Sequence, residues 1–233
     1  MSALGIVIPT LNAGGPGGLV RTLEAIGPAA AAAGWPILVS DGGSTDGTPG
    51  TALRHGARMI RAPRGRGSQL AAGAAALLAD GTAEWLFFLH ADSVPDPSWA
   101  DEAARFTAAA ENRARAGYGR FALDDGAAPA RRIERLVGWR CRRLGLPYGD
   151  QGLLVHRDLY RAAGGFPAIP LMEDVALVRR IGRRRLVPLP FAVTTSAERY
   201  RRGGYVLRPL RNLGCLALYL AGLPPSAVRR LYG

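Results

Sequence analysis

The first hundred residues alternate short apolar runs with helical segments, and this alternation constrains the fold more than any other feature. The apolar runs are long enough for a buried strand and too short for a helix. They lie at residues 4–8, 37–40, 57–61 and 84–89. Amphipathic or alanine-rich segments separate them, beginning near residues 19, 48 and 67. Strands that alternate with helices in this way predict an α/β fold built on a parallel, doubly wound sheet.

The second half of the chain is less regular. Helical patterns cover residues 99–113, 129–144, 158–163, 173–184 and about 205–220. Strand patterns cover residues 118–123, 152–156, 186–189 and 192–195. Because no segment is long enough to separate two domains, we expect a single domain over residues 1–233. Its halves, about 1–95 and about 96–233, are expected to have different tasks.

The charge of the chain is unusual, whereas its length and hydropathy are ordinary. A chain of 233 residues can bury one sizeable core. The formal net charge is +12, and all thirty basic residues are arginine. Arginine forms bidentate pairs with phosphate, so a phosphate-bearing partner is one interpretation. A genome-wide codon bias explains the missing lysine but leaves the surplus of positive over negative charge unexplained.

Cysteine usage and hydropathy bear on the location of the protein. Cys141 and Cys215 form neither a disulfide framework nor a metal-ligand spacing. No signal peptide is evident, and no apolar run reaches the roughly 18 residues that span a bilayer. We therefore expect a cytoplasmic protein. Residues 131–143 and 208–230 mix arginine with apolar side chains, which suits a peripheral position at the inner face of the membrane, packing on the domain, or a homodimer face.

Polar side chains follow three of the predicted strands. Asn12 follows the first strand, Asp41 the second, and the sequence His90-Ala-Asp92 the fourth. Ligands of open α/β sheets bind beyond the carboxyl ends of the strands. Asp92 would lie there, where a hard cation and a diphosphate can meet. The competing interpretation is that Asp92 caps the next helix, and Pro95 is expected to prevent further strand pairing.

Two glycine-containing loops are candidates for ligand contact. In the first, Gly42 and Gly43 allow close backbone approach beside Asp41, and residues 44–46 suit helix capping. In the second, Arg64 and Arg66 alternate with glycine where a helix begins, which suits an anion site. The competing interpretations are a capping turn and a solvated basic turn. The second loop lacks the lysine of a P-loop.

A second acidic site stands at Glu173 and Asp174, where another helix is predicted to begin. Carboxylates in the first turn of a helix interact favourably with the helix dipole, which would explain these residues by a structural role. The functional explanation is that one carboxylate acts as a general base toward a hydroxyl group.

Together, these motifs resemble the family-2 glycosyltransferases of the GT-A fold. The matching segments are residues 6–12, 39–48, 88–95 and 164–174, in the family's order and at its approximate spacing. The resemblance implies a Rossmann-like, mostly parallel sheet flanked by helices, with a smaller mixed sheet on the acceptor side. It also implies an inverting transferase that uses a nucleotide-diphosphate sugar, an acceptor hydroxyl, and Mg²⁺ or Mn²⁺.

The resemblance also implies roles for individual residues. Asp174 would deprotonate the acceptor and Glu173 would support it. Asp92 would bind the metal as the second acid of an Asp-X-Asp motif. Asp41 would hold the base, usually uracil. The remaining residues of the nucleotide-sugar site would be Pro9, Thr10, Asn12, Arg66 and Ala91.

The chain departs from the family's pattern at two points. His90 occupies the place of the first acid of Asp-X-Asp, where it could ligate the metal, bond to the ribose, or simply pack. The Gln-X-X-Arg-Trp segment of processive synthases is absent, which argues against a processive polymerase. Residues 195–204 form instead a basic, glycine-hinged segment, which would place Arg199 and Arg201 over the diphosphate or remain solvated.

Two other functions compete with this interpretation. A sugar nucleotidyltransferase needs basic residues in a glycine-rich loop after its first strand, whereas this chain has none between Asn12 and Arg21. A non-enzymatic nucleic-acid-binding protein would suit the charge, but the arginines are scattered and few aromatic residues stand between them. We therefore expect no specific nucleic-acid partner. Neither the sugar nor the acceptor can be read from the sequence.

Overall fold

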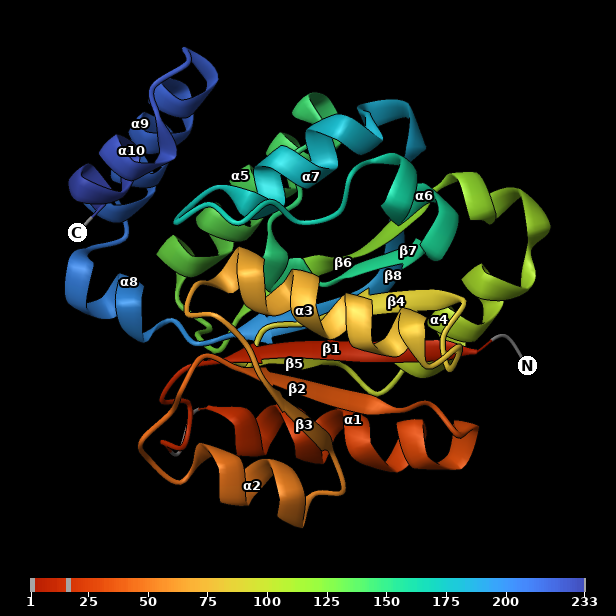
Figure 1. Ribbon diagram of the computed structural model, residues 1–233. Coiled ribbons are helices and arrows are strands. Elements are labelled where there is room, and N and C mark those ends of the chain that lie inside the picture. Colours follow the sequence, from red (N-terminus) through yellow and green to blue (C-terminus); the bar gives the residue numbers. More distant parts are fainter. Residues whose placement is uncertain (1–2, 16–17, 233) are drawn as a thin grey trace.

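The computed structural model describes residues 3–15 and 18–232, and a single eight-stranded sheet runs through them (Figure 1). The strand order is β3-β2-β1-β4-β7-β6-β8-β5. The first four of these are parallel: β3 (Arg58–Arg61), β2 (Ile37–Asp41), β1 (Leu4–Thr10) and β4 (Trp85–Phe88). This half matches the parallel arrangement that the alternating pattern predicts.

The strands of the second half extend the same sheet in mixed directions. β7 (Leu153–His156) is antiparallel to β4, and β6 (Ala116–Leu123) is antiparallel to β7. β8 (Leu186–Thr195) is parallel to β6, and β5 (Ser93–Pro95) closes the edge antiparallel to β8. The mixed part is therefore continuous with the parallel part.

Helices cover both faces of the sheet, as Figure 1 shows. α1 (Leu19–Ala33) and α4 (Trp99–Ala108) pack on one face, with α2 (Thr48–Arg54) beside α1. α3 (Arg66–Ala79), α6 (Arg157–Ala162) and α7 (Glu173–Ile181) pack on the other face. Successive side chains of a strand point to opposite faces. Val7 therefore enters the core under α3, whereas Ile6 and Ile8 enter the core over α1.

The remaining helices lie around one end of the sheet. α5 (Ala128–Leu144) covers Phe121 and Leu123 of β6. After β8 come α8 (Glu198–Gly203), α9 (Leu207–Leu220) and α10 (Pro225–Tyr232). The last two form a hairpin at the upper left of Figure 1. Within residues 3–15 and 18–232, no helix combines the length and the apolar character that crossing a bilayer requires.

Two expectations about strands were wrong. Residues 186–189 and 192–195 belong to one strand, β8, in spite of Pro188 and Pro190. The register between β6 and β8 shifts between Tyr118 and Arg120, and this irregularity accommodates the prolines. Pro95 does not end strand pairing, because it lies in β5 opposite Val193. Its missing N–H is tolerated because β5 is an edge strand.

The helical expectations also need correction. The helix expected over residues 99–113 ends at Ala108 and is followed by a 3₁₀ turn, Ala110–Ala114. The helix expected over residues 173–184 ends at Ile181, because Gly182 has a φ of 89°. α8 and α10 were not predicted.

Candidate active site

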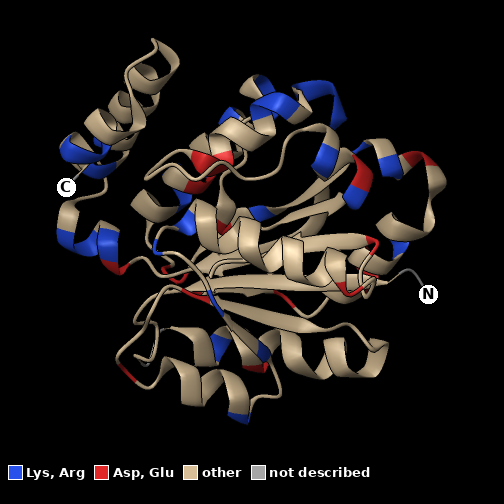
Figure 2. Cartoon of the chain, in the orientation of Figure 1, with Lys and Arg blue, Asp and Glu red and all other residues tan. Residues whose placement is uncertain are grey.

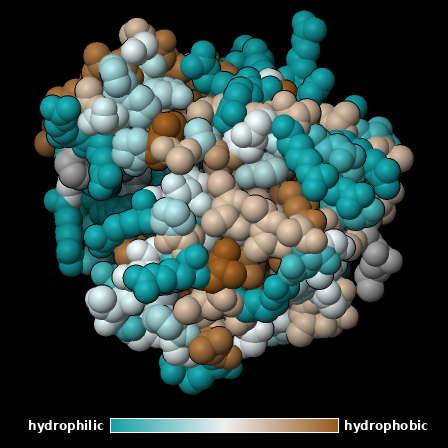
Figure 3. Space-filling view, viewed as in Figure 1, coloured by the Kyte–Doolittle hydropathy of each residue, from teal (hydrophilic) through white to brown (hydrophobic). Residues whose placement is uncertain are grey.

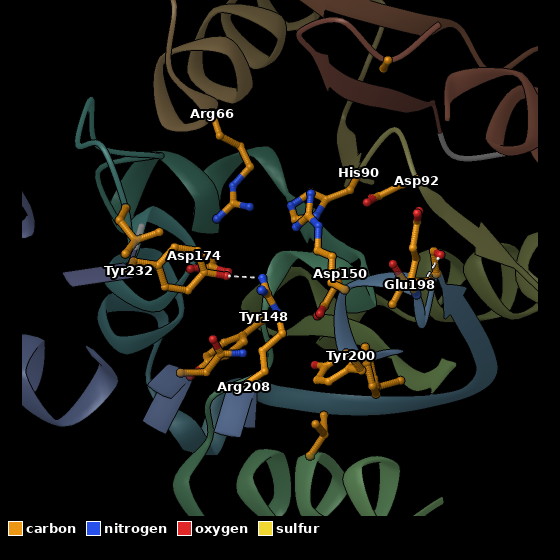
Figure 4. A pocket seen from close by; sticks show the side chains of 18 of the residues that line it. Arg66, His90, Asp92, Tyr148, Asp150, Asp174, Glu198, Tyr200, Arg208 and Tyr232 are labelled. Atoms are coloured by element: carbon orange, nitrogen blue, oxygen red, sulfur yellow. Dashed lines mark hydrogen bonds between the residues drawn. The ribbon is translucent and has the colours of Figure 1, made fainter. Parts of the chain in front are cut away.

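A cavity of about 600 Å³ lies beyond the carboxyl ends of β1 and β4 (Figure 4). Asn12 borders it from the loop after β1, and His90 and Asp92 border it from the loop after β4. Arg66, at the start of α3, and Asp174, in the first turn of α7, complete this part of the wall. With Arg199 of α8, the tertiary structure brings six of the predicted site residues to one cavity.

Asp41 organises the floor beneath this cavity. Its buried carboxylate accepts hydrogen bonds from the Thr10 hydroxyl (2.9 Å), the Ser44 hydroxyl, and the backbone N–H groups of Gly43 (2.9 Å) and Ser44 (2.8 Å). Burial raises the pKa of Asp41, but these four hydrogen bonds outweigh it and hold the pKa below its usual value. Asp41, Thr10 and Pro9 are buried and do not line the cavity themselves.

The loops after β1 and β2 are joined by further hydrogen bonds. The Asn12 N–H donates to the Ser44 hydroxyl (2.8 Å), and the Thr45 N–H donates to the Asn12 side-chain oxygen (3.0 Å). Asp46 accepts from the Gly14 N–H (2.9 Å) and from the Thr48 N–H (3.0 Å) where α2 begins. The N-cap of α2 is Gly47, which forms no side-chain cap bond, and Asp46, one residue before it, accepts from the first N–H of the helix instead. The same bonds hold Asn12 at the cavity.

Arg66 forms an ion pair with Glu173 across the interface between α3 and α7. The Glu173 side chain is only 1% exposed, and its Oε2 atom has no hydrogen-bond partner within the described residues. Burial and the neighbouring Asp174 raise the pKa of Glu173, whereas the Arg66 guanidinium opposes the rise. A Cβ on Gly67 would lie 2.2 Å from the carbonyl oxygen of Pro167, so this interface is close-packed.

Asp174 faces the cavity, whereas Glu173 does not line it. The Oδ2 atom of Asp174 accepts a hydrogen bond from the Gly149 N–H (2.9 Å), and the Oδ1 atom of Asp174 accepts one from the Val175 N–H (2.7 Å). Met172, with a φ of 67°, turns the chain just before the helix. Two backbone donors therefore fix the carboxylate at the wall while it still borders open space.

Asp92 borders the cavity, and none of the described residues pairs with it. Within the part of the chain that the structure describes, no hydrogen bond or ion pair involves its carboxylate, and helix capping is therefore excluded. The turn before α4 is held by Asp96, which accepts from the Ser98 N–H (3.0 Å). The Thr22 hydroxyl donates a hydrogen bond to the carbonyl oxygen of Ala91 (2.9 Å), which lies between His90 and Asp92.

His90 packs closely against the loop before β7. Its Nε2 atom is buried without a partner among the described residues, and a Cβ on Gly149 would lie 2.4 Å from it. Burial, and then the charges of Arg66 and Arg199, lower the pKa of His90 well below its usual value. The imidazole is therefore neutral near neutral pH, which is the form that binds metals.

The metal-binding side chains at this wall suit a hard cation whose remaining ligands are substrate phosphates and water. Within residues 3–15 and 18–232, no three acidic, histidine or cysteine side chains cluster so as to hold a metal ion. Mg²⁺ is commonly held by one or two carboxylates together with substrate phosphates and water. Asp92, with the neutral His90 beside it, fits that arrangement.

The two arginines expected over the diphosphate have different environments. Arg199 lines the cavity from α8. Arg201 does not line it, because its guanidinium pairs with Asp124 (3.4 Å) and Asp125 (3.5 Å) at the end of β6. The expectation for Arg201 is therefore wrong. Each helical position turns by about 100°, so residues 199 and 201 project about 200° apart and lie on different faces of the helix.

Sequence reasoning missed the opposite wall, which Figure 4 shows to be aromatic and basic. Arg140 stacks on the Tyr148 ring, with 3.4 Å between its Cζ and the ring centroid. The guanidinium of Arg208 donates to the Tyr232 hydroxyl (3.5 Å). These side chains come from segments far apart in sequence, and no local sequence motif predicts that they meet. Tyr200 lies on the same wall.

Asp150 is the other site residue that the sequence did not identify. It lines the cavity, and its Oδ1 atom is buried without a partner in the described chain. Burial, together with the charges of Asp174 and Asp92, raises its pKa to about 6, although Arg140 and Arg66 oppose the rise. The only signal in the sequence is its position between Gly149 and Gly152.

Comparisons with known proteins agree with this geometry. The model of the family "Glycosyl transferase family 2" matches residues 5–143. No curated protein matches the sequence. Among solved structures, S. aureus TarS 1-349 is similar with a TM-score of 0.65 and 13% identity, over 100% of this chain and 69% of that chain. Glucosyl-3-phosphoglycerate synthase from Mycobacterium tuberculosis is similar with a TM-score of 0.57 and 19% identity, over 84% and 70%.

These two similarities establish the fold, which is the GT-A fold expected from the sequence motifs. The family match covers more than half of the chain and includes Asn12, Asp41, Arg66 and Asp92, but it ends before Asp174. The chain therefore belongs to glycosyl transferase family 2 and is a glycosyltransferase.

Proposed function

We propose that the protein is an inverting glycosyltransferase that moves a sugar from a UDP-sugar to the hydroxyl group of an acceptor. The observation that carries the proposal is the meeting of Asn12, Arg66, Asp92 and Asp174 at one cavity. Structures of similar proteins support the donor class. One is TarS in complex with UDP-GlcNAc, with a TM-score of 0.61 and 14% identity, over 100% of this chain and 70% of that chain.

The nucleotide would occupy the side of the cavity formed by the loops after β1 and β2. Asp41 takes part by holding Thr10 and the backbone of residues 43–44 in place. The base would then lie against the loop that this carboxylate shapes, with Asn12 at its edge and Pro9 beneath. Asp41 would contribute to base recognition through the loop that it holds.

Asp92, with His90 beside it, would hold Mg²⁺ or Mn²⁺. A divalent ion there would neutralise charge on the diphosphate as it leaves. A similar structure, glucosyl-3-phosphoglycerate synthase in complex with Mn²⁺, UDP-glucose and phosphoglyceric acid, supports this metal class (TM-score 0.54, 18% identity).

The chain's own residues would take the proton from the acceptor and stabilise the negative charge of the leaving group. The acceptor oxygen forms a bond to the anomeric carbon as the bond from that carbon to the diphosphate oxygen breaks, which inverts the configuration. Asp174 takes the hydroxyl proton, because two backbone N–H groups orient its carboxylate toward the cavity. Glu173 supports Asp174 indirectly by fixing Arg66, and the guanidinium groups of Arg66 and Arg199 stabilise the negative leaving group.

The base assignment is tested with Asp174→Asn, which keeps the shape of the side chain. We expect transfer to fall by at least about a hundredfold, the range for a lost general base, with donor affinity nearly unchanged. Asp101→Asn on α4 is the matched control, because Asp101 is exposed and does not line the cavity. An equal loss of donor binding and turnover would assign Asp174 a structural role.

The metal assignment is tested by calorimetric titration with UDP. We expect binding to need Mn²⁺ and to weaken at least tenfold in Asp92→Asn, because Asp92 would hold the cation that neutralises the diphosphate. The same variant should bind no more weakly than the parent when a chelator is present. Equal affinity of the parent chain with Mn²⁺ and with chelator would contradict the assignment.

A further inference from the structure

The outer face of α9 is apolar and exposed to solvent. It comprises Val206, Leu207, Leu210, Leu213, Leu218 and Leu220, which we call the α9 face. The most exposed of these side chains are Leu207 (73%), Val206 (67%) and Leu210 (59%). At 3.6 residues per turn, the six positions fall within an arc about 160° wide. No charged residue lies within that arc.

The opposite face of α9 already has partners. Cys215 and Leu216 are buried against the domain, and Arg208 and Asn212 line the cavity. The α9 face therefore contributes nothing to the core of the chain. Single exposed leucines are ordinary on protein surfaces, but a contiguous apolar patch of this kind marks an interaction site.

α10, the other helix of the hairpin, extends the apolar surface, and α5 carries exposed apolar side chains beside the same cavity. Leu136 and Trp139 of α5 are 62% and 52% exposed, and Leu231 of α10 is 54% exposed. Figure 3 shows hydrophobic atoms gathered at the upper left, over the α9–α10 hairpin of Figure 1. α5 and α9 border the same cavity through Val137 and Arg208, so the extended surface lies beside the opening to the site.

The charge around this surface has one sign. After Glu198 the sequence contains no acidic residue, whereas it contains seven arginines. Figure 2 shows basic segments on α8 and on the hairpin, with no acidic segment beyond the start of α8. Arg201 and Arg202 pair with acidic side chains, and Arg199 and Arg208 line the cavity. The arginines of the hairpin that remain available to a partner are Arg211, Arg229 and Arg230. An apolar face rimmed by arginine complements a surface that is apolar within and anionic at its edge.

We infer that the α9 face docks on the surface of an anionic lipid bilayer. α9 would lie in the plane of the interface, with its leucines among the acyl chains and its arginines at the headgroups. A second copy of the chain is a poor occupant, because each copy would bring Arg211, Arg229 and Arg230 to the contact, and the hairpin carries no acidic residue to pair with them. Docking in this way would place the opening of the cavity near the lipid surface, and the inference does not depend on the proposed function.

The test uses the full chain and large unilamellar vesicles in a pelleting assay. One set contains phosphatidylcholine alone, and the other contains phosphatidylcholine with about 30% phosphatidylglycerol. We expect the protein to pellet with the anionic vesicles at 50 mM NaCl, to be released as salt rises, and to bind the neutral vesicles at least tenfold more weakly.

The variant Leu210→Asp places a charge in the α9 face and should weaken anionic-vesicle binding at least tenfold. Leu53→Asp is the matched control. Leu53 is 63% exposed on α2, which lies away from the hairpin in Figure 1, so its replacement should leave binding unchanged. Thermal melting followed by circular dichroism checks that both variants fold.

Three results would overturn the inference. The first is no pelleting of the parent chain with anionic vesicles at 50 mM NaCl. The second is an equal effect of the two folded variants. The third is a dimer, found by light scattering, that Leu210→Asp dissociates, because the face would then be occupied by a second copy. Arg229→Ala combined with Arg230→Ala should flatten the salt dependence, and an unchanged dependence would also count against the role of charge.

Discussion

Replacing Asp150 by Asn should stabilise the fold at neutral pH. The carboxylate borders the cavity, one of its oxygens is buried without a partner in the described chain, and its neighbours include the negative charges of Asp174 and Asp92. Its pKa of about 6 in the folded protein compares with an ordinary value of 3.8. Each pKa unit corresponds to about 1.4 kcal/mol, so the ionised group costs the fold up to about 3 kcal/mol. Solvent in the cavity screens the charge, and we expect a gain of about 1 to 3 kcal/mol.

The direction of the pH dependence follows from the raised pKa. Between pH 3.8 and about 6 the folded chain binds a proton at Asp150 that the unfolded chain has already released. Stability is therefore lost as pH rises through this window, and the loss is complete above pH 6. The advantage of Asp150→Asn should be largest at pH 7.5 and should shrink below about 1 kcal/mol near pH 4.

The measurement is urea denaturation of the parent and variant chains at pH 7.5, 6, 5 and 4. The difference between the two chains reports Asp150 together with its coupling to Asp174 and Asp92, because carboxylates far from the cavity titrate equally in both. Glu24→Gln serves as the control, since Glu24 is exposed on α1 and has no ion pair within the described residues, and it should show little change at any pH. If Asp150→Asn were destabilising at pH 7.5, or if its effect did not vary with pH, the argument from burial and like charge would be refuted.

Two further predictions concern the packing of α3 against α7. Arg66→Met leaves the buried Glu173 unpaired and should destabilise the fold by about 3 kcal/mol at pH 7.5 in urea denaturation. The loss should diminish at pH 5 as Glu173 gains a proton, and a loss independent of pH would contradict the ion-pair explanation. Gly67→Ala places a Cβ 2.2 Å from the Pro167 carbonyl oxygen and should cost about 1 to 3 kcal/mol in thermal melting. The control, Gly27→Ala on α1, meets no atom within 4 Å and should be neutral or stabilising, so an equal loss in both variants would count against the steric cause.

Local patterns in the sequence were sufficient for much of the fold. Strand and helix periodicities depend only on neighbouring residues, so β1, β2, β4 and the helices between them could be predicted. The polar residues Asn12 and Asp92 could be placed at one edge for the same reason, because parallel strands end on the same side of the sheet. Their meeting at the cavity agrees with that argument.

Other features depend on contacts between distant segments and had no local signal. The position of β7 between β4 and β6 depends on pairing across most of the chain. The partners of Arg201 are Asp124 and Asp125, which lie more than seventy positions away in the sequence. The wall that contains Tyr232 depends on the return of the C-terminal hairpin to the cavity.

The sequence by itself determined the class of fold, the order of its motifs and the family to which the chain belongs. Only the tertiary structure decided which charges are buried together. Asp174 and Asp150 are 24 positions apart, yet the charge of Asp174 raises the pKa of Asp150, and the charge of Asp92 adds to the effect. The physical reason is that periodicity reflects local backbone geometry, whereas the protonation and exposure of a group reflect every segment that packs around it.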